Sequence, residues 1–116
     1  MAKCFGQLIL QARKEKGYSQ RDLAKLVALD FTYLSKLEND RADYAPKEDV
    51  IRKLAEHLTL DAEELVFLAG RIPERDEEFL KQNYKEMPAL FRRMQENPEF
   101  AQKIFNEAAQ QEKQEE

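Results

Sequence analysis

Residues 19–41 read SQRDLAKLVALDFTYLSKLENDR, and this stretch decides the fold. Ser19 followed by Asp22 predicts a helix that begins near Gln20, because the hydroxyl can accept a hydrogen bond from an unpaired N–H at the helix start. The apolar residues behind this start recur at helical spacing and predict one buried stripe. They are Leu23, Leu26 and Val27, with the small Ala24 beside them.

A second short helix is predicted to begin after Asp30, which is a second N-cap candidate. Leu34 and Leu37 form its buried side, so the two helices are joined by a tight turn at residues 28–29. The opposite face is polar and rich in hydrogen-bond donors, which suits base edges and phosphate oxygens. That face comprises Thr32, Ser35, Lys36 and Asn39.

The stretch from Gln20 to Glu38 resembles the helix-turn-helix of the phage-repressor or XRE-type family, which includes Cro and repressor-like domains. The family pattern has a small residue in the first helix, which is Ala24 in this chain. It has a glycine in the turn, where this chain has Ala28. If the turn needs a left-handed backbone, alanine costs about 1 kcal/mol there. The alternative is that these are two ordinary core helices of some small helical domain.

The chain's composition excludes most other classes of function. One cysteine (Cys4), one histidine (His57) and three glycines cannot supply a zinc site, a nucleophile with its base, or a phosphate-binding glycine loop. We therefore expect no enzyme activity, no metal and no cofactor. No apolar run approaches the roughly 18 residues of a membrane span, and no cleavable signal is visible, so the expected location is the cytoplasm.

The net charge of −4 is unevenly distributed along the chain. Residues 1–41 carry 8 Lys and Arg against 5 Asp and Glu, whereas residues 42–72 carry 4 against 7 and residues 73–116 carry 7 against 11. The positive excess therefore coincides with the predicted DNA-contacting segment. Because it is modest, we expect moderate non-specific DNA affinity that falls with salt.

Helix signals on both sides of the motif complete the first domain, residues 1–72. An amphipathic helix from Phe5 is expected to end at Gly17, another to follow Pro46, and a fifth to begin after Asp61 and close at Gly70. The predicted fold class is all-α: a five-helix, repressor-like helix-turn-helix domain followed by a short helical C-terminal segment. The family resemblance covers about residues 5–72.

The resemblance also implies roles for individual residues. Arg13 and Glu38 match an arginine and a glutamate that form a structural ion pair in the family. Positions that match DNA contacts of relatives are Gln20 (phosphate), Phe31, Thr32 and Lys36 (base edges), and Asn39 and Arg41 (DNA backbone), with Lys47 a weaker candidate. Ser35 joins this set as part of the outward face. Phe31 either presses on a thymine methyl or packs on a neighbouring loop, and Tyr33 either touches a phosphate or packs.

Residues 73–116 form an acidic amphipathic segment beyond the resemblance. Three short helices are predicted, with one stripe of Leu80, Tyr84 and Met87, a restart at Pro88, and an N-cap at Asn97 before Pro98. We expect the apolar residues of the last two of these helices to pair with a second copy of the chain. The alternatives are that these helices fold back on the first domain or bind another protein. These residues are Leu90, Phe91, Met94, Phe100, Ile104 and Phe105. The tail from about residue 110 is expected to fray.

The sequence thus predicts a sequence-specific transcriptional regulator that binds double-stranded DNA, is a homodimeric repressor, and reads a palindromic or pseudopalindromic operator. The alternative is an antitoxin or adaptor-type interaction module whose C-terminal helices bind another protein. Neither hypothesis involves a membrane.

Overall fold

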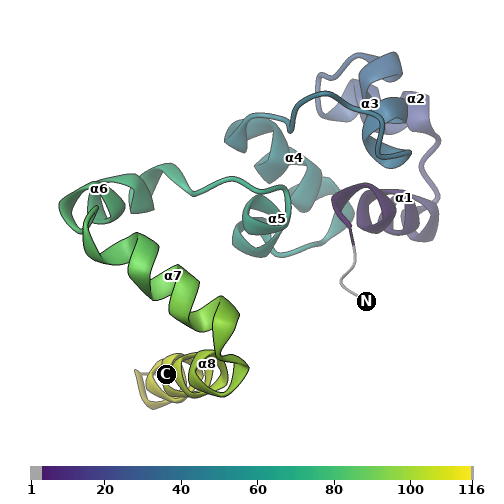
Figure 1. Cartoon of the computed structure of the whole chain (residues 1–116). Coiled ribbons are helices and arrows are strands. Elements are labelled where there is room, and N and C mark those ends of the chain that lie inside the picture. The colour runs from purple at the N-terminus through teal and green to yellow at the C-terminus, as the bar shows by residue number, and fades with distance from the viewer. Residues whose placement is uncertain (1–3, 116) are drawn as a thin grey trace. The chain divides into compact units, whose positions relative to one another are not determined.

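The computed structural model describes residues 4–115, with side chains as far as Glu112, and these residues form eight helices. The chain divides into two compact units, the first ending at Asp76 and the second beginning at Glu77. Figure 1 shows the helices in chain order. Their bounds are α1 Phe5–Lys16, α2 Gln20–Leu26, α3 Phe31–Glu38, α4 Glu48–Leu58, α5 Ala62–Leu68, α6 Glu74–Gln82, α7 Glu86–Glu96 and α8 Pro98–Glu115.

The first unit contains α1–α5 (Figure 1). Each of these helices contributes buried side chains to a single hydrophobic core. Helix α1 packs on α3 and α4, α2 packs on α3, and α4 packs on α5. The prediction of an all-α, five-helix domain is confirmed. The core residues are Ile9, Ala12, Leu23, Ala24, Val27, Leu34, Ile51, Leu54, Ala55, Leu58, Leu65 and Val66.

Leu26, which the periodicity placed in a buried stripe, lies outward and is 44% exposed. In α2 the buried residues are Leu23 and Ala24, with Val27 directly after the helix, so the centre of the inward face lies between them. Leu26 is about 100° away from that centre on the helix, at about 100° per residue, and the prediction of its burial was wrong.

The helix boundaries follow the local signals closely. Gly17 ends α1 with φ 77°, and its N–H donates to backbone carbonyls of the last turn, as expected of a glycine C-cap. Asp61 accepts the N–H of Glu64 at 3.0 Å and so caps α5. Helix α4 begins at Glu48 with Lys47 as its N-cap, just after the buried Pro46.

The first unit extends past residue 72, where the sequence placed its end. Pro73 is fully buried, the Glu74 N–H donates to the Glu48 carboxylate at 2.8 Å, and Arg75 pairs with Glu63. The Glu74 N–H and the Arg52 guanidinium lower the pKa of the Glu48 carboxyl. The start of α6 therefore belongs to the first unit.

The second unit consists of the rest of α6 with α7 and α8, and α7 packs on α8 (Figure 1). Asn97 caps α8 by accepting the Phe100 N–H at 3.1 Å, as predicted. The predicted stripe through Tyr84 is interrupted, because α6 ends at Gln82 and Tyr84 lies in a turn, 65% exposed. Pro88 lies inside the first turn of α7, where its missing N–H breaks no helical hydrogen bond.

Helix α8 continues through Glu115, beyond residue 110 where we expected the tail to fray. Its C-terminal part consists of alanine, glutamine, glutamate and lysine, which are good helix formers, and contains no glycine or proline. Favourable backbone propensity thus extends the helix where no apolar stripe remains. None of the helices within residues 4–115 is long and apolar enough to cross a membrane.

Candidate nucleic-acid interface

Local hydrogen bonds fix the start of both helices of the motif. Ser19 accepts the Asp22 N–H at 3.0 Å, while the Asp22 carboxylate accepts the Ser19 N–H at 3.4 Å, which completes a capping box. Asp30 accepts the Thr32 N–H at 3.0 Å and so caps α3. Both N-cap predictions are confirmed. The turn between the helices contains Ala28 at φ 56°, the left-handed conformation that usually favours glycine.

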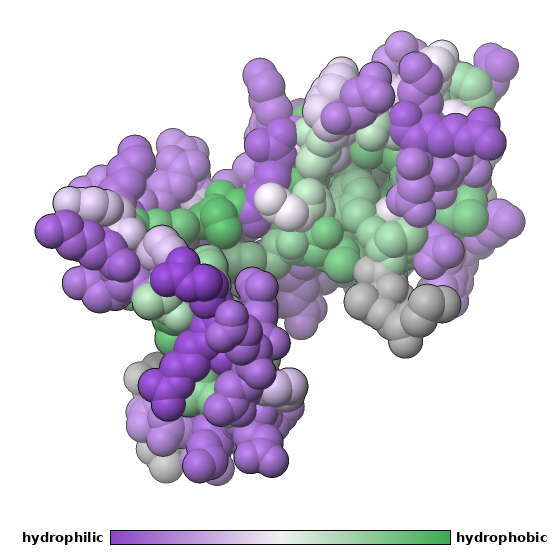
Figure 2. Space-filling model, viewed as in Figure 1, coloured by the Kyte–Doolittle hydropathy of each residue, from purple (hydrophilic) through white to green (hydrophobic). Residues whose placement is uncertain are grey.

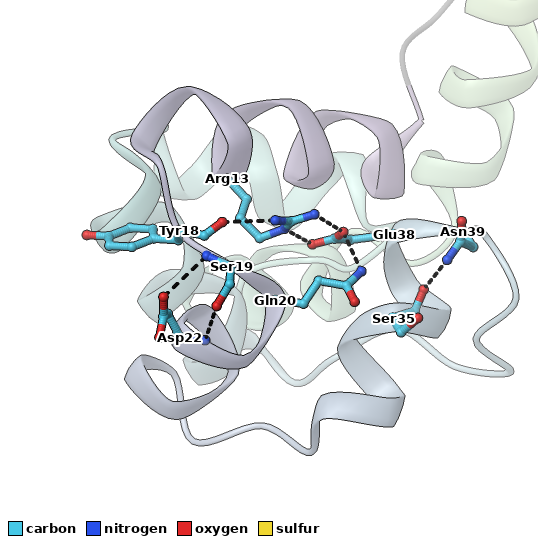
Figure 3. A network of polar contacts seen from close by, with 8 residues as sticks. All are labelled: Arg13, Tyr18, Ser19, Gln20, Asp22, Ser35, Glu38 and Asn39. Atoms are coloured by element: carbon cyan, nitrogen blue, oxygen red, sulfur yellow. Dashed lines mark hydrogen bonds and ion pairs between the residues drawn. The ribbon is translucent and has the colours of Figure 1, made fainter.

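A buried polar network ties α1, α2 and α3 together (Figure 3). The Arg13 guanidinium donates to both Glu38 oxygens, at 2.8 and 3.0 Å, and to the Tyr18 carbonyl at 2.9 Å. Gln20 adds a donor to Glu38 Oε1 at 2.9 Å. The Glu38 side chain is 1% exposed and that of Arg13 is 10% exposed, so the pair implied by the resemblance lies inside the protein. The hydrogen bonds from Arg13 and Gln20 compensate for the free-energy cost of burying the Glu38 carboxylate.

The network changes the expectation for Gln20. Its side-chain nitrogen, which the resemblance directed to a DNA phosphate, donates to Glu38 inside the protein (Figure 3). Residues 20 and 38 are far apart in the sequence, so no local pattern could indicate this bond. The structure therefore places Gln20 in the support of α3, with a half-buried side chain.

The outward face of α3 carries the predicted donors. Leu34, Leu37 and Glu38 are buried, whereas Thr32 and Lys36 are exposed and Ser35 is half-buried. Lys36 makes no ion pair within the described residues. Hydroxyl and ammonium groups thus lie on one side of a helix whose other side is packed in the core. Such a helix can present its side chains to the edges of bases.

Aromatic residues lie at the two edges of this face. Tyr33 stacks on Tyr44 with ring centroids 5.0 Å apart and donates its hydroxyl hydrogen to the Tyr44 carbonyl at 2.9 Å. Burial raises the pKa of the Tyr33 hydroxyl, and the facing Tyr44 raises it to a smaller extent. The positive charge of Arg71 acts in the opposite direction and lowers it. Of the two roles considered for Tyr33, the structure shows the packing role, against Tyr44.

Phe31 lies at the other edge and is 39% exposed. The Arg21 guanidinium carbon lies 5.0 Å from the centre of its ring. The ring thus lies against a side chain of α2. Arg21 was not among the residues that the sequence singled out, because no spacing rule relates the second residue of one helix to the first residue of the next.

Some residues after α3 make hydrogen bonds within the protein, and others have exposed, charged side chains. Asn39 donates its side-chain N–H to the Ser35 carbonyl at 2.8 Å and so closes the helix (Figure 3). The Arg41 backbone N–H donates to the Lys36 carbonyl at 2.8 Å, while its side chain is exposed. Lys47 is exposed at the start of α4. Arg41 and Lys47 therefore keep exposed cations, whereas Asn39 uses one side-chain donor within the protein.

The loop from α3 to α4 is held from α5 by a residue that the sequence did not indicate. Arg71, which follows α5, donates to the carbonyls of Ala45, at 2.7 Å, and Pro46. The same loop supplies the Tyr44 carbonyl that binds Tyr33. Arg71 thereby connects the end of the five-helix core to one edge of α3.

Cys4 and His57 lie in different elements of the first unit, Cys4 at the N-cap of α1 and His57 in α4. The Cys4 thiol donates to the Asp40 carboxylate at 3.0 Å and caps α1 by accepting the Gln7 N–H at 3.4 Å. His57 is half-buried beside the core face of α4. Within the described part of the chain, no group of three or more histidine, cysteine, aspartate or glutamate side chains could hold a metal ion.

The second unit carries a different surface. A groove of about 370 Å³ between α7 and α8 is lined by Phe91, Met94, Gln95, Ala101 and Phe105. Phe91 is 47% and Phe105 58% exposed, and Figure 2 shows hydrophobic surface among the polar side chains of this unit. Leu90, Phe100 and Ile104 are half-buried, with the Arg93 guanidinium 4.2 Å from the Phe100 ring centre.

The chain is similar to known proteins in both units. A family model described as a helix-turn-helix domain matches residues 6–71. The ImmF control region 10 kDa protein of Bacillus phage phi105 is 39% identical over 59 residues, which are 51% of this chain and 63% of the phage protein's length. The chain therefore aligns with less than two thirds of that relative.

Two solved structures are also similar. One is the crystal structure of SinR, a master regulator for biofilm formation, in complex with DNA; its chain is 34% identical, with a TM-score of 0.48, and the match covers 53% of this chain and 97% of that one. The other is a chain of the SinR protein/SinI protein complex, 27% identical with a TM-score of 0.50 and 94% of both chains covered. With the family model matching more than half its length, this chain belongs to the helix-turn-helix domain family, in the phage-repressor or XRE-type class.

Proposed function

We propose that this protein is a transcriptional regulator that binds specific sequences in double-stranded DNA through the outward face of α3. The observation that carries the proposal is the division of α3 into a buried side, with Leu34 and Leu37, and an exposed donor side, with Thr32 and Lys36. The major groove, about 12 Å wide, accepts one α-helix and displays a distinct donor and acceptor pattern for each base pair. Membership in the helix-turn-helix family supports this use of α3.

The side chains of α3 have distinct roles in this proposal. Lys36 reaches a base acceptor such as guanine O6 or N7, and the Thr32 and Ser35 hydroxyls adapt to either donor or acceptor. Arg41 and Lys47 contact phosphates at the rim, which sets the position of α3 without reading sequence. The basic excess lies in residues 1–41, with 8 Lys and Arg against 5 Asp and Glu, so the attraction to DNA is local and falls with salt.

We also propose that the groove between α7 and α8 pairs with the same groove of a second copy. Within the described residues of α6–α8 no side chain is fully buried, although the helices carry several aromatic residues. A helix pair with its apolar face in water is poorly stabilised, and a two-fold related copy offers a face of the same chemistry. Two copies would place two α3 helices on half-sites one DNA turn apart, so the operator is palindromic or pseudopalindromic. Occupancy of a promoter-overlapping site then gives repression.

A second candidate function is the binding of a different protein by the C-terminal helices, as in an antitoxin or adaptor. The observation in its favour is the similarity, over 94% of both chains, to a chain from the complex of SinR with SinI. In that case DNA binding is secondary, and α7 and α8 dock on a partner other than a second copy of this chain.

Selection of bound fragments from random duplex DNA tests the DNA-binding proposal. We expect the purified chain to enrich one motif with two related half-sites, and competition by that duplex to exceed competition by bulk genomic DNA. Equal competition by both would contradict sequence-specific binding. An enriched site without internal symmetry would contradict only the palindrome.

Sedimentation of the purified chain tests the pairing. Phe91→Ala combined with Phe105→Ala should convert a dimer into a monomer, whereas Phe67→Ala, at a 54% exposed phenylalanine of α5, should not. A wild-type chain that sediments as a monomer, but as a complex when co-expressed with the product of a neighbouring gene, would favour the second candidate function.

A further inference from the structure

An arginine of α2 lies over an aromatic ring of α3 at the edge of the candidate interface. The Arg21 guanidinium carbon is 5.0 Å from the centre of the Phe31 ring, within the roughly 6 Å at which a cation and an aromatic face attract each other. Arg21 is exposed, Phe31 is 39% exposed, and Arg21 forms no ion pair within the described residues. Its charge is therefore held in place but not neutralised.

The group that packs against Arg21 determines which ligands its guanidinium can bind. A carboxylate beside Arg21 would take up its donors and cancel its charge. A phenyl face orients the planar guanidinium while leaving the N–H donors at its edge for an anion. A guanidinium held in this way suits a phosphate, which it can bind through two parallel hydrogen bonds.

Phe31 lies beside the donor face of α3 rather than at its centre. At about 100° per residue, Thr32 and Lys36 lie opposite the buried Leu34, whereas Phe31 lies about 100° from Thr32, toward the helix that carries Arg21. Base edges would meet the centre of the face, and the phosphates that border the groove would meet its edge. The stacked guanidinium is thus placed where a phosphate is expected.

We propose that Arg21 binds a DNA phosphate and that Phe31 is a positioning residue that holds the guanidinium for this contact. The inference rests on the proposed function and adds to it a contact that the family resemblance did not imply. It also decides between the roles considered for Phe31: the ring acts through Arg21 and not on a thymine methyl.

A double-mutant cycle tests the proposal, with duplex affinity measured by fluorescence anisotropy at three salt concentrations. We expect Arg21→Ala to weaken binding about tenfold, the scale of a charged hydrogen bond, and to reduce the slope of log K against log salt by about one. Phe31→Leu should weaken binding about threefold in the wild-type chain and leave it unchanged in the Arg21→Ala chain. Phe31→Tyr, which keeps the aromatic face, should retain wild-type affinity.

The selected duplex and an unrelated duplex should respond equally, since a phosphate contact carries no sequence information. A Phe31→Leu loss that persists in the Arg21→Ala chain and is confined to the selected duplex would overturn the proposal in favour of a direct base contact. An unchanged salt slope for Arg21→Ala would also overturn it. Circular dichroism melting of each variant checks that these exposed positions do not affect folding.

The unrelated duplex separates this proposal from the proposed function. If the wild-type chain shows no sequence preference, the regulator hypothesis fails, while the cycle on the unrelated duplex still tests the Arg21 contact. If the chain binds the selected duplex specifically, but the affinity losses of Arg21→Ala and Phe31→Leu simply add in the double variant, only the role of Phe31 fails.

Discussion

Gly6 of α1 packs directly against the backbone of Leu37 of α3, so closely that a Cβ atom at residue 6 would collide with the Leu37 carbonyl oxygen. The same Cβ would also lie 3.2 Å from the Glu38 carbonyl oxygen. The absence of a side chain at residue 6 therefore determines how closely α1 approaches the last turn of α3.

Gly6→Ala should destabilise the first unit, because the two backbones must move apart to accommodate a methyl group. Overpacking of this kind costs about 1–3 kcal/mol. Gly17→Ala is the matched control, since a Cβ there meets nothing within 4 Å and only the φ of +77° is unfavourable, at a cost of about 1 kcal/mol. Thermal melting should show the larger loss for Gly6→Ala. Equal melting temperatures for the two variants would contradict the close contact.

Arg13→Ala should lower the free energy of unfolding by about 3–5 kcal/mol, because it leaves the Glu38 carboxylate buried without its cation. Arg52→Ala, in the partly exposed pair with Glu48, should cost about 0–1 kcal/mol. Urea denaturation measures both losses. A variant at Arg13 that unfolds like the wild type but no longer binds DNA would show that this arginine contacts DNA instead of supporting α3.

Ala28→Gly should raise the stability of the first unit, since Ala28 has φ 56° and glycine adopts this conformation without a Cβ clash. After the added flexibility of the unfolded chain, about 0.4–1 kcal/mol, is deducted from the strain of about 1 kcal/mol, we expect a gain of up to about 0.6 kcal/mol. Ala69→Gly, at φ −73°, should lower the stability instead. Differential scanning calorimetry of the two variants gives the comparison, and a loss of stability in both would mean that the turn is not strained.

Tyr33 should make the stability fall in alkaline solution. Burial raises the pKa of its hydroxyl, so the folded state favours the neutral form. This contribution is complete below the pKa of an unfolded tyrosine, about 10, and is lost as pH rises through the higher folded value. Urea denaturation from pH 8 to 11 should show a decline above pH 10 that is shallower for Tyr33→Phe. The same decline in both chains would assign it to other groups.

Lys36→Ala should weaken binding to the selected duplex by about 1–3 kcal/mol and leave binding to unrelated DNA nearly unchanged. Lys53→Ala removes an exposed lysine from α4 and should affect neither. Anisotropy titrations on both duplexes measure these effects. An equal loss on both duplexes would assign Lys36 to a phosphate.

The features that the sequence predicted well depend on neighbours in the chain. The Ser19 capping box, the Asp30 cap and the Gly17 C-cap each join residues two to four positions apart, and local residue chemistry alone indicates them. Leu26 and Tyr84 were misjudged because helical spacing gives the direction of a stripe only when the centre of the buried face and the ends of the helix are known.

The sequence by itself therefore determined the family, the five-helix order and the donor face of α3, because spacing and capping are properties of short segments. Only the tertiary structure decided that Gln20 supports Glu38, that Arg71 holds the loop beside Tyr33, and that Arg21 lies over Phe31. Each of these contacts joins different elements of the fold. Their partners are chosen by how the helices pack, which no local pattern encodes.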